Sequence, residues 1–237
     1  TKITDTNVNE NISRLKQFYN NEGYFDSKVS ADTILNYNQA SIKYSITKNT
    51  QYLIDSISIN TNSEDIDSLI SSSRVQSILK KEENFSINKL ILERDRLVNL
   101  FKNNGIHDFQ QRSINYNVLI DSSGVNKKIP LILSIKNPSE KEAYQIRKIN
   151  DINIYVESID QLSNIDSYTD SLNFNGIKIF SKGNLNYSTK SLTEPIFFEK
   201  GENYSEEKKL LTSRYFSNIG AFKYPRIIIE ENNDSLS

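Results

Sequence analysis

Three segments of the sequence end in the same pattern, and this repetition limits the chain to tandem copies of one small unit. In each segment a glycine follows an aromatic residue by four positions and an asparagine by two; the glycines are Gly23, Gly105 and Gly220. Glycine commonly follows the last turn of a helix because it enters the left-handed conformation without steric cost. Each segment is therefore predicted to be a helix that stops at its glycine.

The copy around Gly105 is complete. Apolar residues before this glycine recur at three- and four-residue steps from Ser86 onward, which predicts an amphipathic helix, and after it they alternate, which predicts a hairpin with one buried face. The predicted elements are a strand at 52–59, helices at 66–79 and 86–104, and a hairpin of strands 114–120 and 129–135 with a turn at 122–124. The unit therefore has the order β-α-α-β-β.

This order predicts an α+β fold of tandem units, each a three-stranded mixed sheet covered by two helices. Residues 1–50 correspond to the C-terminal half of a unit, and residues 51–140 form the complete one. Residues 141–237 begin a further copy, because 144–149 matches the strand at 52–57. This last copy lacks a final strand and carries an insertion near 158–190, in which we expect a hairpin of 177–180 and 184–187. By the same alignment the chain starts and stops inside repeats, so the hairpin of residues 1–50 should expose apolar side chains.

The composition excludes several classes of function. Lys and Arg number 29 and Asp and Glu 30, so a net charge of −1 leaves no positive surplus for a nucleic acid. No segment has the roughly 20 apolar residues of a membrane-spanning helix. Cysteine is absent and His107 is the single histidine, which excludes disulfides, thiolate sites and histidine-rich metal sites. We expect neither a metal nor a cofactor.

Catalytic candidates are few. Glu93 and Asp95 are two residues apart on a predicted helix and point to different faces, so they cannot act as a carboxylate pair. Both are expected on a solvated face beside Arg94 and Arg96. His107 is expected in a surface loop, and no nucleophile motif lies near it. An enzyme is therefore the least favoured class, and no catalytic residue is predicted.

A protein-binding strand edge is the remaining candidate site. The strand predicted from Gln111 to Ile120 carries one charge, Arg112, and no proline, so its edge is poorly protected against pairing with another chain. Because apolar and polar residues alternate along this strand, the side chain of Ile114 should point inward and the side chains of its neighbours outward. The predicted edge residues are Gln111, Arg112, Ser113, Asn115, Asn117 and Leu119. Shielding of this edge by a neighbouring repeat is the alternative.

The repeated β-α-α-β-β unit with these helix endings resembles the POTRA domain. Three stretches, 97–111, 201–205 and 221–225, resemble the Bacteroidetes branch of the BamA/TamA (Omp85) family, and within it the lipoprotein form TamL. The resemblance extends over essentially the whole chain.

This resemblance implies periplasmic domains that precede an outer-membrane β-barrel and take part in assembly and transport of outer-membrane proteins. It implies unfolded outer-membrane clients and a TamB-like, periplasm-spanning partner, with membrane contact only through a barrel outside this chain. BamA itself is an alternative, as is a repeat-built cell-surface or adhesin spacer. A lipobox cysteine upstream of Thr1 would indicate the TamL-like form, and about sixteen alternating segments downstream would indicate a barrel.

Overall fold

The computed structural model describes residues 5–37, 39–121, 125–139, 143–156, 168, 170–182, 185–220, 222 and 225–231. The chain folds as two compact units, one of Thr1–Val98 with Phe109–Tyr144, the other of Asn99–Asp108 with Gln145–Ser237. Both contain helices and a three-stranded mixed sheet, so the predicted α+β class is confirmed. The division into 1–50, 51–140 and 141–237 remains a prediction.

The first unit begins with a helix and a hairpin. Helix α1 (Asp5–Asn21) precedes strands β1 (Lys28–Asn36) and β2 (Gln39–Thr47), which pair antiparallel from Lys28 opposite Thr47. These are the helix and hairpin predicted for residues 1–50. The hairpin exposes apolar side chains, as expected: Leu35 is 77% exposed and Ile34 44%.

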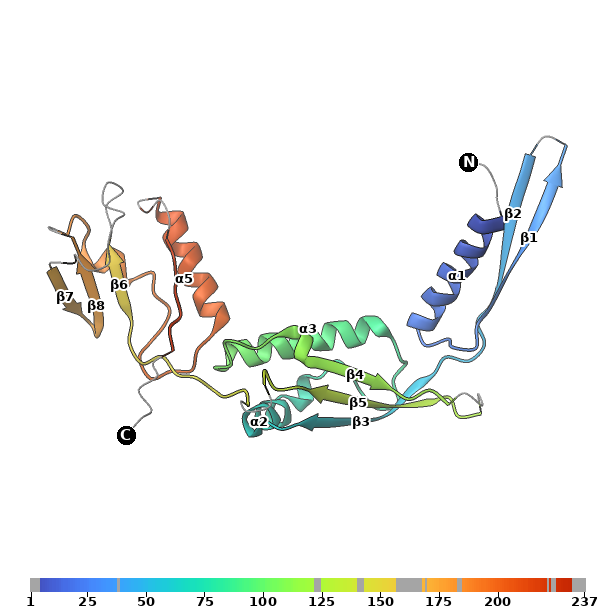
Figure 1. The fold of residues 1–237 in the computed structure, drawn as a ribbon, viewed down its shortest axis with the longest axis horizontal. Coiled ribbons are helices and arrows are strands. Elements are labelled where there is room, and N and C mark those ends of the chain that lie inside the picture. The colour runs from blue at the N-terminus through green and yellow to red at the C-terminus, as the bar shows by residue number, and fades with distance from the viewer. Residues whose placement is uncertain are drawn as a thin grey trace. The chain divides into compact units, whose positions relative to one another are not determined.

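The same unit contains a three-stranded sheet with strand order β3-β5-β4 (Figure 1). Strand β5 lies in the middle, parallel to β3 and antiparallel to β4. The elements are β3 (Leu53–Thr61), α2 (Glu64–Ser72), α3 (Ile87–Asn103), β4 (Ile114–Val118) and β5 (Lys128–Ile135). The predicted turn at 122–124 lies outside the described residues.

Helix α2 is shorter than the predicted helix at 66–79. The N–H of Ser73 bonds back to the carbonyls of Leu69 and Ile70, and a single 3₁₀ turn (Arg74–Gln76) follows. Ile78 and Leu79, which were predicted to be helical, lie in the irregular segment after this turn. Polar contacts of this segment with α3, described below, replace the helical hydrogen bonds.

The core of this unit lies between the sheet and its helices. Every second residue of β5 is buried, from Ile129 to Ile135, as the alternation predicted. Leu97 of α3 is fully buried. The central cluster consists of Tyr52, Ile54, Leu79, Phe85, Leu90, Ile129 and Leu131, with Phe25, Ile57, Ile87, Tyr116 and Val118 packed against it.

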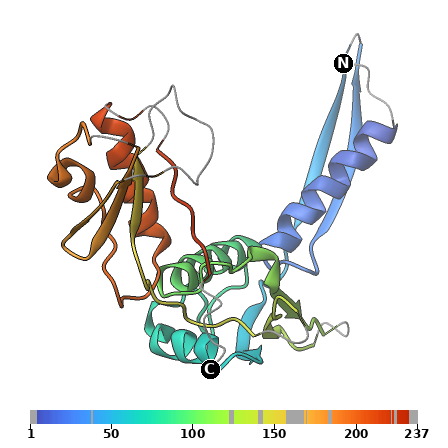
Figure 2. The same ribbon diagram turned by 60° about the vertical axis from the view of Figure 1, so that its left-hand side comes forward.

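The sheet of the second unit has strand order β6-β8-β7 and lies against helix α5, which is red in Figures 1 and 2. Strand β8 is parallel to β6 and antiparallel to β7, the same pattern as β5 with β3 and β4. The elements are β6 (Asn153–Val156), β7 (Asp170–Phe174), β8 (Ile177–Ser181), α4 (Thr189–Thr193) and α5 (Glu206–Ile219). Helix α5 starts after its N-cap Ser205 and stops at Gly220, as predicted.

The hairpin expected at 177–180 and 184–187 was placed wrongly. Strand β8 pairs with the preceding β7, and the turn between them is Asn175–Gly176. Both turn residues have positive φ, 52° and 82°, as the tight turns favoured in two-residue hairpins require. Residues 158–167, 169, 183 and 184, which belong to the predicted insertion, lie outside the described residues.

A backbone junction follows the helix-ending glycine of the first unit. The N–H of Tyr52 donates to the carbonyl of Gly23 (2.9 Å), and the N–H of Phe85 donates to the carbonyl of Tyr52 (2.9 Å). Phe85 directly precedes Ser86, after which α3 begins. One residue, Tyr52, thus connects the end of α1 to the start of α3.

The second unit repeats this junction with Arg147 in place of Tyr52. Its N–H donates to the carbonyl of Gly105 (2.9 Å), and its carbonyl accepts from the N–H of Tyr204 (3.0 Å), which directly precedes Ser205. The predicted match of 144–149 with 52–57 was therefore shifted by three residues, and the predicted strand at 144–149 is replaced by an isolated bridge at Lys148. The apolar alternation of this segment fits either alignment, so alternation alone could not fix it.

Candidate protein-binding edge

Strand β4 is an edge strand, because β5 lies on one side of it and no described strand pairs with the other side. It runs from Ile114 to Val118, which is shorter than the strand predicted from Gln111 to Ile120. Gln111–Ser113 forms a 3₁₀ turn before it. Beyond it, the N–H of Leu119 reaches the Pro130 carbonyl at 3.5 Å, but proline has no N–H to return, so the ladder ends there.

The register determines which backbone groups of β4 are free. Ser113 accepts from the N–H of Lys136, and Leu119 donates to Pro130, so the odd-numbered residues of this strand point their backbone groups toward β5. The backbone groups of Ile114, Tyr116 and Val118 therefore point away from β5. The N–H of Ile114 bonds to the Gln111 carbonyl, which leaves the N–H groups of Tyr116 and Val118 as the free donors of this edge.

The predicted edge residues fall into two groups. Asn115, Asn117 and the exposed Leu119 lie along the strand or at its end, with their backbone groups directed to β5. Gln111, Arg112 and Ser113 lie in the 3₁₀ turn. Among these, the side chain of Gln111 donates to Asp95 (2.9 Å), and Ser113 is buried with its hydroxyl 2.8 Å from that of Tyr144.

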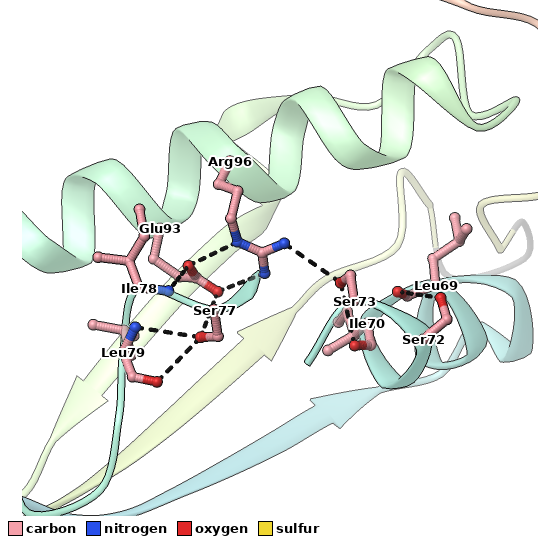
Figure 3. A network of polar contacts seen from close by, with 9 residues as sticks. All are labelled: Leu69, Ile70, Ser72, Ser73, Ser77, Ile78, Leu79, Glu93 and Arg96. Atoms are coloured by element: carbon pink, nitrogen blue, oxygen red, sulfur yellow. Dashed lines mark hydrogen bonds and ion pairs between the residues drawn. The ribbon is translucent and has the colours of Figure 1, made fainter. Parts of the chain in front are cut away.

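Helix α3 is held by a buried ion pair (Figure 3). Glu93 is only 3% exposed, so the solvated face predicted for it was wrong. Its carboxylate accepts two hydrogen bonds from the Arg96 guanidinium (2.7 and 2.9 Å), one from the Ser77 hydroxyl (2.9 Å) and one from the Ile78 N–H (2.8 Å). Arg96 also donates to the Ser73 hydroxyl (3.4 Å). The network joins α3 to the segment that follows α2.

On the β4 side of α3, Arg94 lies over the ring of Tyr116, with the guanidinium carbon 5.6 Å from the ring centroid. The Nε of Arg94 and the hydroxyl of Tyr116 are both enclosed and have no hydrogen-bond partner among the described residues. Burial raises the pKa of the Tyr116 hydroxyl, so it remains a protonated donor at neutral pH. Sequence reasoning missed this pair, because α3 and β4 are apart in the chain.

A second polar cluster of the first unit surrounds the Lys127 ammonium group. Lys127 donates to Asp26 and to the Tyr52 hydroxyl (3.3 Å). The hydrogen bond from Lys127 lowers the pKa of Asp26, and the same bond raises the pKa of Lys127, so both stay charged near neutrality and neither suits general acid–base catalysis. His107, predicted in a surface loop, is half-buried against the ring of Tyr204.

Two further findings concern metals and membranes. Within the described ranges, no three His, Cys, Asp or Glu side chains gather as a metal site would require. None of the helices formed by the described residues combines the length and apolarity of a membrane span.

Comparison with known proteins gave likenesses only among solved structures. No family model and no curated protein matches the chain. The chain is similar to BamA POTRA3-5 of Haemophilus influenzae, at 14% identity over 96% of this chain and 75% of that one, with a TM-score of 0.42. It is also similar to POTRA1-3 of Omp85 from Anabaena, at 11% identity over 99% and 86% of the two chains, with a TM-score of 0.29.

Proposed function

We propose that this chain is a POTRA segment of an Omp85-type outer-membrane assembly factor, and that it acts as a non-catalytic binding module on the periplasmic side of that membrane. The observation that supports this most is the free edge of β4 in a β-α-α-β-β unit. An unpaired strand can bind an extended segment of another protein through its backbone, whatever the sequence of that segment. Such binding suits a protein that handles many unrelated, unfolded outer-membrane clients.

The finer form of the proposal is a TamA/TamL-like lipoprotein with a TamB-like partner. It rests on the sequence likeness of 97–111 and 201–205. A segment of BamA is the second candidate, and the repeated unit supports both equally. The full-length sequence would distinguish these candidates. A lipobox cysteine upstream of Thr1 would indicate the TamL-like form, and barrel strands downstream would exclude an adhesin spacer.

Backbone pairing along β4 is expected to be weak. Each new hydrogen bond contributes about 0.5–1.5 kcal/mol net, whereas ordering the incoming strand costs about 1–2 kcal/mol per residue. The two terms are similar in size, so side-chain contacts decide whether a segment binds. Weak capture also allows release toward the membrane.

The edge can be tested with an extended peptide of alternating apolar and polar residues, titrated into the isotope-labelled chain. We expect the amide signals of Tyr116 and Val118 to shift, and their hydrogen exchange, fast in the free chain, to slow on binding. The amides of Asn115 and Asn117 should be protected with or without peptide, because they bond to β5. Proline at Asn117 would therefore disrupt the β4–β5 ladder.

N-methylation of the peptide provides the matched control. Two peptides are compared, one methylated on every second amide and the other methylated on the remaining amides. Only alternate amides of the added strand face β4, so one methylation pattern should abolish binding and the other should leave it intact. Shifts confined to the helical face, unaffected by either methylation pattern, would refute strand addition. Absence of any peptide response would favour the spacer.

A further inference from the structure

The charge on Arg94 is not compensated within its own helix. Its neighbour Glu93 has all its hydrogen bonds with Arg96, Ser77 and Ile78, and Asp95 is bonded to Gln111. Among the described residues, Arg94 forms no ion pair. A guanidinium that is held against an aromatic ring and lacks a carboxylate can still bind one through two parallel hydrogen bonds.

The position of Arg94 places this charge beside the free edge. Tyr116, on which Arg94 stacks, is the middle residue of β4, and its backbone groups point away from β5. A strand added at this edge would lie about 4.8 Å from β4. One of its side chains on the helix-facing side would then stand next to Tyr116 and Arg94.

The chemistry of this pair selects for an acidic side chain. Arginine has only donors, so the Arg94 guanidinium requires an acceptor from the incoming residue. A carboxylate accepts from the guanidinium and also neutralises it, whereas a lysine at this position would be repelled. An amide can accept but gains no charge-assisted bond.

The flanking positions are apolar. Ile91, one turn before Arg94, is 43% exposed, and Val98, one turn after it, is half-buried. Ile114 and Val118 stand on either side of Tyr116 on the same face of β4. Three successive helix-facing side chains of an incoming strand, spaced two residues apart, therefore meet an apolar surface, the cationic Arg94 and a second apolar surface.

Resting on the proposed function, we infer that Arg94 and Tyr116 determine the specificity of the β4 edge. They select a partner strand that carries Asp or Glu opposite Tyr116, with an apolar side chain two residues before it and another two residues after it. Sequence-independent backbone pairing would then be supplemented by one charge-selective position.

Three peptides that differ only in a central Glu, Gln or Lys test this inference in the full chain, with the Tyr116 and Val118 amides as readout. We expect the Glu peptide to bind at least about tenfold more tightly than the Gln peptide, as one charge-assisted bond would provide, and the Lys peptide to bind most weakly. The Glu preference should shrink as salt is added.

Variants of Arg94 identify the residue responsible. Arg94→Met should abolish the Glu preference, and Arg94→Glu should reverse it in favour of the Lys peptide. Arg94→Lys keeps the positive charge and should retain part of the Glu preference. It replaces the methionine variant as the test if that variant folds poorly. Arg74→Met, at an exposed arginine in the 3₁₀ turn after α2, is the matched control and should leave the preference unchanged.

The outcomes separate the two proposals. Equal affinity of all three peptides, with shifts at β4, would overturn the selectivity of Arg94 and leave strand addition standing. A Glu preference that persists in Arg94→Met would also overturn it. Absence of β4 shifts with every peptide would overturn both proposals.

Discussion

Replacing Glu93 with alanine is expected to lower the free energy of unfolding by about 3–5 kcal/mol, the usual loss when one partner of a buried ion pair is removed. The Glu93 side chain is 4% exposed, and the Arg96 side chain that faces it is 18% exposed. Its removal leaves a buried guanidinium without an anion, and it leaves the Ile78 N–H and the Ser77 hydroxyl without their acceptor. Urea unfolding followed by circular dichroism would measure the change.

Two further variants show whether burial is the cause. Asp95→Ala removes a carboxylate two residues away on the same helix, but its partner Gln111 is exposed, so a loss below about 1 kcal/mol is expected. Replacing both Glu93 and Arg96 with methionine should destabilise less than Glu93→Ala alone, because no uncompensated charge remains. Similar losses for Glu93→Ala and Asp95→Ala would contradict the buried network.

The first unit was largely predictable from the sequence because its signals are local. Alternation from Ile129 to Ile135 predicted β5, and apolar spacing up to Phe101 predicted α3. Glycine stops located the helix ends. The lengths of α2 and β4 were predicted too long, and Glu93 was placed wrongly. The sequence neighbours of Glu93 are charged, and nothing local indicates that Arg96 and the loop at Ser77 enclose it.

The second unit was predicted less well because its register depends on contacts between distant segments. Alternation in 144–149 fits more than one alignment with 52–57. The hydrogen bonds of Arg147 with Gly105 and Tyr204 select one of them, and they join residues far apart in sequence. The hairpin of β7 and β8 did have a local signal, the Asn175–Gly176 pair, which is a strong indicator of a two-residue turn.

The binding edge was predictable only in outline. Low charge and absence of proline indicate an unprotected strand, but they do not show which backbone groups are free. That depends on the register between β4 and β5, which Lys136 and Pro130 reveal through their hydrogen bonds. The contact of Arg94 with Tyr116 depends on the packing of α3 on the sheet, so no spacing in the sequence could indicate it.

Replacing Gly23 or Gly105 with alanine is expected to destabilise the chain more than the same change at Gly220. All three glycines have positive φ, at 83°, 105° and 69°, where alanine costs about 1–2 kcal/mol. A Cβ at Gly23 would lie 2.7 Å from the Phe85 carbonyl oxygen, and one at Gly105 would lie 2.6 Å from the Ile146 side chain. Such overpacking adds about 1–3 kcal/mol.

Gly220 is the matched control, because no described heavy atom lies within 4 Å of a Cβ built there. Asparagine tolerates the left-handed conformation, so Gly220→Asn should recover most of the stability that Gly220→Ala loses, whereas Gly23→Asn should remain destabilised by the contact with Phe85. Urea midpoints of the five variants would measure these differences. If alanine at Gly23 and alanine at Gly220 cause equal losses of stability, the cost at Gly23 comes from the left-handed conformation alone. The close contact with Phe85 at the start of α3 would then not be the reason for a glycine at position 23.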